Sequence, residues 1–158
     1  MNSDILLFAH PTFGVLGIIA SVWVFVETLN ASDVNVARTK TAALIVTGCI
    51  AMAGILGGYW YVNFYAPEKA IILKGPWPFA HNLVMETKEH LFFIPLILAL
   101  YLPFAAWDNL KGNKAARNMV LVVTLLIALS GLAIEGAGAV INYGVKVAFV
   151  HTGVKGAE

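Results

Sequence analysis

The third apolar run of the chain reads FAHNLVMETKEHLFFIPLILALYLPFAA, from Phe79 to Ala106. This is long enough to cross the hydrocarbon core of a bilayer, which takes about 20 apolar residues in a helix. Its first half nevertheless holds two histidines, two glutamates and a lysine between His81 and His90. Ionisable side chains at the centre of a membrane helix cost about 2.5–3.5 kcal/mol each on insertion scales, so they indicate a functional site.

The composition of the whole chain also indicates a membrane environment. The 158 residues are 59% hydrophobic and 12% charged, with a mean hydropathy of +0.80, whereas a soluble domain carries about 25% charged residues. The net charge of +1 argues against nucleic acid as a partner. The single cysteine, Cys49, excludes an intrachain disulfide and a thiolate metal cluster built by this chain alone. We therefore expect the lipid bilayer to surround it.

Four apolar runs predict an all-α integral membrane protein, a four-helix up-down bundle. The spans are expected at about 5–29, 41–65, 79–106 and 118–143, within a single transmembrane domain over residues 1–158. Each is long enough to span about 30 Å of hydrocarbon with some tilt. Short connections make neighbouring helices antiparallel, and an open sheet cannot sit in lipid.

Basic residues predict the orientation of the spans. Arg38 and Lys40 follow the first span, and Lys111, Lys114 and Arg117 follow the third. An excess of Lys and Arg is typical of cytoplasmic loops. We therefore expect an integral protein of the bacterial inner (plasma) membrane, with its N- and C-termini on the non-cytoplasmic side.

With this topology the polar residues of three spans fall in one layer. His10 lies in the first span, Glu86 and His90 in the third, and Glu135 in the fourth. All four are roughly 8–17 Å from their helix ends at 1.5 Å per residue. Glu86 and His90 are four residues apart and share a helix face. We expect that face to point inward, toward His10 and Glu135. The alternative is a purely structural cluster, in which Glu135 is hydrogen-bonded to His90 and no ligand is bound.

His81 and Lys88 are expected on the opposite face of the third span. In an α-helix, His81 and His90 lie about half a turn apart around the axis, so the two histidines cannot serve one site without a break in the helix. We expect His81 near the outer membrane surface, and Lys88 to extend toward the same surface.

Glycines accompany the residues of this layer. Gly14 follows His10 in the first span, and Gly131 and Gly138 flank Glu135 in the fourth. Small residues bring membrane helices close together. Glycines beside a histidine also leave space for a flat macrocycle, and the sequence leaves both interpretations open.

The arrangement resembles the small four-helix membrane cytochromes of the b type, in architecture only and without a specific family signature. In those proteins, histidines on two helices ligate a haem b. The resemblance implies His10 and His90 as the ligand pair, with His81 the runner-up for either position. Two imidazole ligands leave the haem six-coordinate and suited to electron transfer. Glu86 or Glu135 would orient a ligand or carry a proton to or from a quinone.

Three functions are therefore considered. The first is a haem-b electron-transfer protein, or a subunit of a respiratory or photosynthetic redox complex, that exchanges electrons with a quinone and an extracytoplasmic cytochrome. The second is a non-haem metal site made by His10, Glu86, His90 and Glu135. The third is a non-redox accessory subunit packed among the other subunits of a membrane complex. Because nothing resembles a nucleophile or a hydrolytic triad, an electron carrier or complex subunit is favoured over a stand-alone enzyme.

Overall fold

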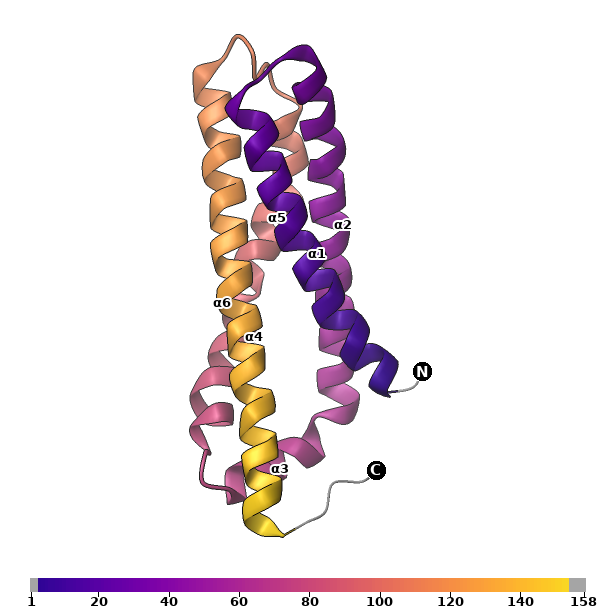
Figure 1. Ribbon diagram of the computed structural model, residues 1–158, viewed down its shortest axis with the longest axis vertical. Coiled ribbons are helices and arrows are strands. Elements are labelled where there is room, and N and C mark those ends of the chain that lie inside the picture. Colours follow the sequence, from indigo (N-terminus) through magenta and orange to yellow (C-terminus); the bar gives the residue numbers. More distant parts are fainter. Residues whose placement is uncertain (1–2, 154–158) are drawn as a thin grey trace.

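The computed structural model describes residues 3–153 as helices joined by short connections, and this range contains no strand (Figure 1). The helices are α1 (Ser3–Leu29), α2 (Asp33–Phe64), α3 (Ala66–Lys74), the π-helix η1 (Ala80–Met85), α4 (Glu86–Leu91), α5 (Phe93–Ala106) and α6 (Lys114–Thr152). Four stretches of the described chain are long and apolar enough to cross a membrane: Ser3–Leu29, Asp33–Phe64, Ala80–Ala106 and Lys114–His151. The predicted all-α class with four apolar spans is confirmed.

Two of the helices are longer than the apolar runs alone indicate. α2 begins at Asp33 rather than near residue 41, because Ser32 caps it: the Ser32 hydroxyl accepts a hydrogen bond from the Asn35 N–H at 3.2 Å. α6 continues to Thr152 rather than ending near residue 143, and Gly153 ends it in the left-handed conformation, with φ 66°. A polar N-terminal segment therefore extends α2, and a mostly apolar C-terminal segment extends α6.

The third span is interrupted twice. It begins as η1, whose i→i+5 hydrogen bonds make a wider turn than those of an α-helix. The helix breaks again at Phe92, between α4 and α5. Pro95 explains this break, because it has no N–H to donate to the Leu91 carbonyl. The faces of this span are therefore rotated relative to those of an uninterrupted α-helix.

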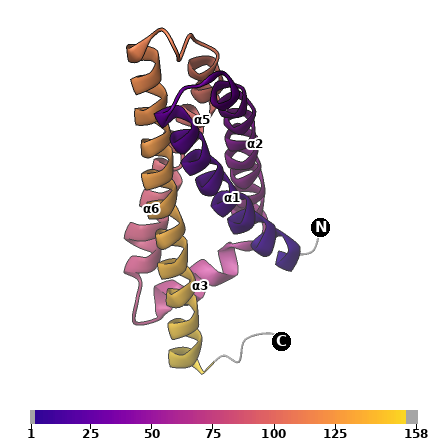
Figure 2. The same cartoon turned by 45° about the horizontal axis from the view of Figure 1, so that its top comes forward.

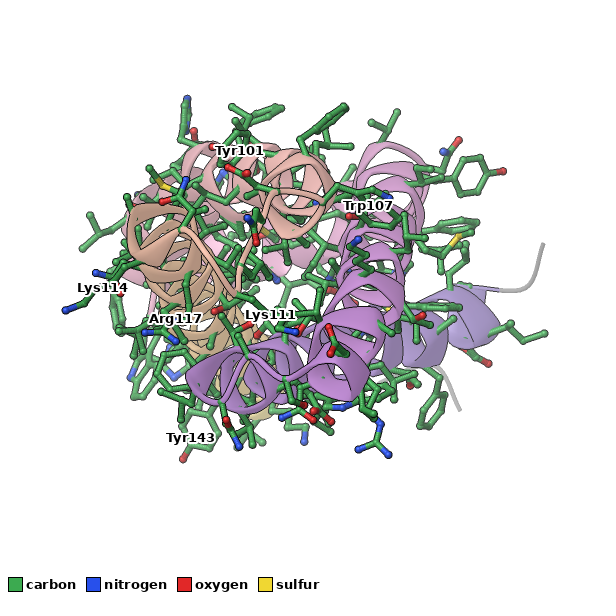
Figure 3. All side chains as sticks on the ribbon, turned by 90° about the horizontal axis from the view of Figure 1, so that it is seen from above. Tyr101, Trp107, Lys111, Lys114, Arg117 and Tyr143 are labelled. Carbon is green, nitrogen blue, oxygen red and sulfur yellow. The ribbon has the colours of Figure 1, made fainter. Side chains whose placement is uncertain are left out.

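The two basic connections meet at one end of the bundle. The Lys111 ammonium lies 2.6 Å from the Asp33 carboxylate at the start of α2. Figure 3 looks onto this end, where Lys111, Lys114 and Arg117 are labelled. The start of α1, the end of α6 and all of α3 lie in the other half of the molecule (Figure 1). The sequence predicted that these connections share a side; which side of a membrane they face stays a prediction.

Apolar side chains form two separate clusters along the bundle. The larger joins α1, α2, α5 and α6 and includes Val46 and Leu102. The smaller, near α3, includes Tyr65 and Ile141. Toward the α3 end, α1 leans away from α6 (Figures 1 and 2), and α1 makes no contact with α4. The helix α4, which carries Glu86, Lys88 and His90, lies in this wider half (Figure 1).

Candidate intramembrane polar site

A chain of polar side chains starts at Tyr65 and passes through His81. The His81 ring is buried, with 2% of the residue exposed. The Tyr65 hydroxyl lies 3.2 Å from His81 Nδ1, and His81 Nε2 lies 3.5 Å from the Glu86 carboxylate. Burial and the surrounding acidic groups raise the pKa of the Tyr65 hydroxyl, which therefore stays neutral. Because the Glu86 carboxylate can only accept, a neutral His81 carries its proton on Nε2, and its Nδ1 accepts a hydrogen bond from the Tyr65 hydroxyl.

The expectation that His81 lies on the face opposite to Glu86 is wrong, and η1 is the reason; its depth in a membrane stays a prediction. In an α-helix, residues five apart fall on different faces. The i→i+5 bonding of a π-helix brings such residues onto one face. His81 and Glu86 are five apart and span η1, so their side chains meet.

Glu86 and His90 share a face, as the sequence predicted, but the direction predicted for that face is wrong. Both residues are exposed, and 48% of the Glu86 side chain is accessible. His90 Nδ1 donates to the Glu86 carbonyl oxygen at 2.6 Å. The π-helix η1, which precedes this pair, changes the face on which the pair lies relative to an uninterrupted α-helix.

Lys88 lies between α4 and α6, and Glu135 lies between α6 and α1. Lys88 is half-buried against α6, where a Cβ added to Gly138 would lie 3.1 Å from its Nζ. The Glu135 carboxylate lies against Gly14 of α1. The two charges attract each other, yet in residues 3–153 neither side chain makes a hydrogen bond or an ion pair. Whether Lys88 extends toward the outer membrane surface stays a prediction.

His10 connects α1 to α2 beside these charges. Its Nδ1 donates to the Ala53 carbonyl at 2.8 Å, and its ring covers Gly57. The charge of Lys88 acts on the ring. His10, Lys88 and Glu135 therefore come from three spans into one group, which we call the intramembrane cluster.

Tyr61 and Glu89 are functional candidates that the sequence interpretation missed. The Tyr61 hydroxyl interacts with the Glu89 carboxylate, whose Oε1 is buried without a hydrogen-bond partner in residues 3–153. Tyr61 also stacks on Tyr65, with 5.1 Å between ring centroids. Glu89 stands in the polar stretch that drew attention to the third span, but its direction could not be assigned without η1.

The predicted non-haem ligand set is not brought together. Glu86 and His90 lie on the exposed face of α4, whereas His10 and Glu135 lie inside. Residues 3–153 contain no group of three or more His, Cys, Asp or Glu side chains that could hold a metal ion.

The two predicted haem ligands, His10 and His90, are each suited to bind haem iron, but they do not point toward a common site. His10 and His90 each hold Nδ1 on a backbone carbonyl, which orients a ligating imidazole and leaves Nε2 for a metal. His10 faces α2, however, while His90 faces outward, and their helices do not touch. One haem ligated by both does not fit this packing, and the haem assignment stays a prediction.

Comparison with protein-family models, curated proteins and solved structures found no match for this chain. The fold and the site themselves define the class: an all-α protein with four membrane-length apolar helices and ionisable side chains inside its wider half.

Proposed function

We propose that this chain is a membrane subunit of a respiratory or photosynthetic redox complex, and that it handles the protons that accompany electron exchange with a quinone. The observation that carries the proposal is the unpaired state of Lys88 and Glu135 within the spans. Ionisable residues inside a bundle, linked in chains, are typical of intramembrane proton relays.

The chemistry of quinones explains why such groups would be needed. Oxidation of a quinol releases two protons together with two electrons, and lipid accepts neither. Glu135 provides a carboxylate within the bundle that can take a proton. Tyr65, His81 and Glu86 form a second set of exchangeable protons nearer the α3 end. The electrons would pass to a haem of the complex, which supplies one-electron transfer when bound.

The outward direction of His90 supports a subunit rather than an isolated carrier. An exposed imidazole and an exposed carboxylate within a span are costly in lipid, and a neighbouring subunit would cover them. Any haem held by His90 would then lie between this chain and that subunit. An extracytoplasmic cytochrome as electron partner and a bacterial inner membrane location, with both termini outside, belong to the same proposal.

The experiment isolates the complex through a tag on this chain and measures its reduction by a short-tailed quinol in stopped flow. The Glu135→Gln variant should be reduced about 100-fold more slowly, the typical contribution of a positioned acid–base group. Glu27→Gln is the matched control, because Glu27 is a carboxylate of another span that pairs with Arg38 at 3.5 Å. It should react within about twofold of the parent, by the same reasoning.

A thermal unfolding curve for each variant separates a chemical effect from misfolding. Equal rates for Glu135→Gln and the parent would refute the role of Glu135. A complex without redox bands and without quinol oxidation would refute the redox assignment and favour the non-redox accessory subunit.

A further inference from the structure

A groove runs along the outside of the bundle between α6 and the first half of the third span. It encloses about 380 Å³, within the roughly 300–1,000 Å³ that is usual for small-molecule sites. Its walls are mostly apolar and include Leu83, Leu91, Ala133 and Ala137. Leu83 and Leu91 are both exposed, so the groove opens toward lipid.

Thr87 and Lys88 provide the polar groups of this groove. Neither side chain donates a hydrogen bond to any group in the part of the chain that the structure describes. An ammonium in a span without an acceptor calls for one. The groove therefore offers two free donors next to an apolar surface.

The hydroxyl of Thr87 makes no hydrogen bond within residues 3–153. Other helical threonines here, such as Thr12, Thr28 and Thr124, donate to the carbonyl four residues before them, at 2.7–2.8 Å. For Thr87 that carbonyl belongs to Leu83, which lies in the π-helix and accepts a hydrogen bond from the Glu86 N–H. The hydroxyl is left available to a ligand.

We propose that this groove binds the head group of a quinone, with Lys88 and Thr87 donating hydrogen bonds to its carbonyl oxygens. The inference rests on the proposed function and names the site at which the quinone would bind. A quinone has only acceptors to offer, a flat apolar ring that suits the walls, and an isoprenoid tail that can leave through the lipid-facing opening. Glu135, which attracts the charge of Lys88, lies behind the floor of the groove.

The depth of the groove favours a quinone over a phospholipid head group. Trp77 and Tyr143 pack together with ring centroids 5.1 Å apart, and such aromatic residues are typical of the membrane interface. Lys88 contacts α6 at Gly138, which is about 7 Å from Tyr143 along the helix at 1.5 Å per residue. The ammonium therefore lies inside the level of lipid phosphates.

The test uses a photoreactive azidoquinone on the purified complex, followed by peptide mapping, together with the KM for a short-tailed quinol. Label should enter the segments 83–91 and 133–138. Lys88→Met should raise KM about 10-fold or more and Thr87→Val about threefold, as expected for loss of a charged and a neutral donor. Lys146→Met, which removes an exposed lysine of α6, should change neither KM nor labelling.

The outcomes separate this inference from the proposed function. Quinol oxidation with unchanged KM in both variants, or label elsewhere, would overturn the groove while the redox function stands. If the complex oxidises no quinol, the proposed function fails. Azidoquinone labelling then tests the groove separately: loss of label in Lys88→Met supports quinone binding there, and unchanged label overturns it. A photoreactive anionic phospholipid provides the comparison. If it labels the same segments as strongly as the azidoquinone, and excess lipid removes the azidoquinone label, the quinone is overturned as the occupant.

Discussion

Gly57 and Gly58 are adjacent in α2, yet their surroundings differ sharply. A Cβ added to Gly57 would lie 2.6 Å from His10 Cε1 and Nδ1, whereas a Cβ on Gly58 would have no atom within 4 Å. The His10 ring cannot simply swing away, because its Nδ1 is bonded to the Ala53 carbonyl. Gly57→Ala should therefore disturb the intramembrane cluster, and Gly58→Ala should not.

The size of the effect follows from comparing the two variants. Replacing glycine by alanine in a helix stabilises by about 0.5–1 kcal/mol, and this gain is common to both and cancels. Gly57→Ala additionally loses a hydrogen bond worth about 0.5–1.5 kcal/mol and is overpacked at a cost of about 1–3 kcal/mol. Gly57→Ala should therefore be about 1.5–4.5 kcal/mol less stable than Gly58→Ala.

The assay is unfolding by SDS in mixed micelles, followed by circular dichroism. A His10→Ala background provides the control, because removal of the ring should abolish the difference between the two alanine variants. Unfolding of Gly57→Ala and Gly58→Ala at the same SDS fraction would refute the placement of His10. A difference that persists without the His10 ring would show that another group causes it.

Two further predictions concern the α3 end. Tyr65→Phe leaves the buried Nδ1 of His81 without its donor, so SDS unfolding should show a loss of about 1–3 kcal/mol. Tyr101→Phe, at a residue 44% exposed, should change little, and equal losses would contradict the buried bond. Burial raises the pKa of the Glu68 carboxyl, so the folded state binds more protons than the unfolded state between the ordinary and the raised pKa. Stability should fall as pH rises through that interval; Glu68→Gln should flatten the thermal unfolding profile, and an unchanged profile would refute the effect.

The sequence predicted the fold because membrane spans depend on length and apolarity, which can be read along the chain. It also predicted that Glu86 and His90 share a face, since both lie in α4 where the α-helical period holds. It failed for His81 and for the direction of that face. Those depend on η1 and the break at Phe92, and neither follows from a pattern with a period of 3.6 residues.

The proximity of Lys88 to Glu135 was equally hidden from the sequence. It depends on which face of α4 meets α6, and the small residue Gly138 opens the space for the ammonium. The depth of His10 in a membrane stays a prediction, and its partner is a backbone carbonyl of α2 rather than a side chain. Backbone acceptors carry no sequence signal, so this contact required the packed helices.

The most direct test of the central claim is a redox-induced infrared difference spectrum of the purified complex during quinol oxidation. If Glu135 takes up a proton released by the quinol, a carboxyl stretching band should appear with turnover in the parent and be missing in Glu135→Gln, while Glu27→Gln retains it. Identical carboxyl bands in all three proteins, with quinol oxidation intact, would contradict the account.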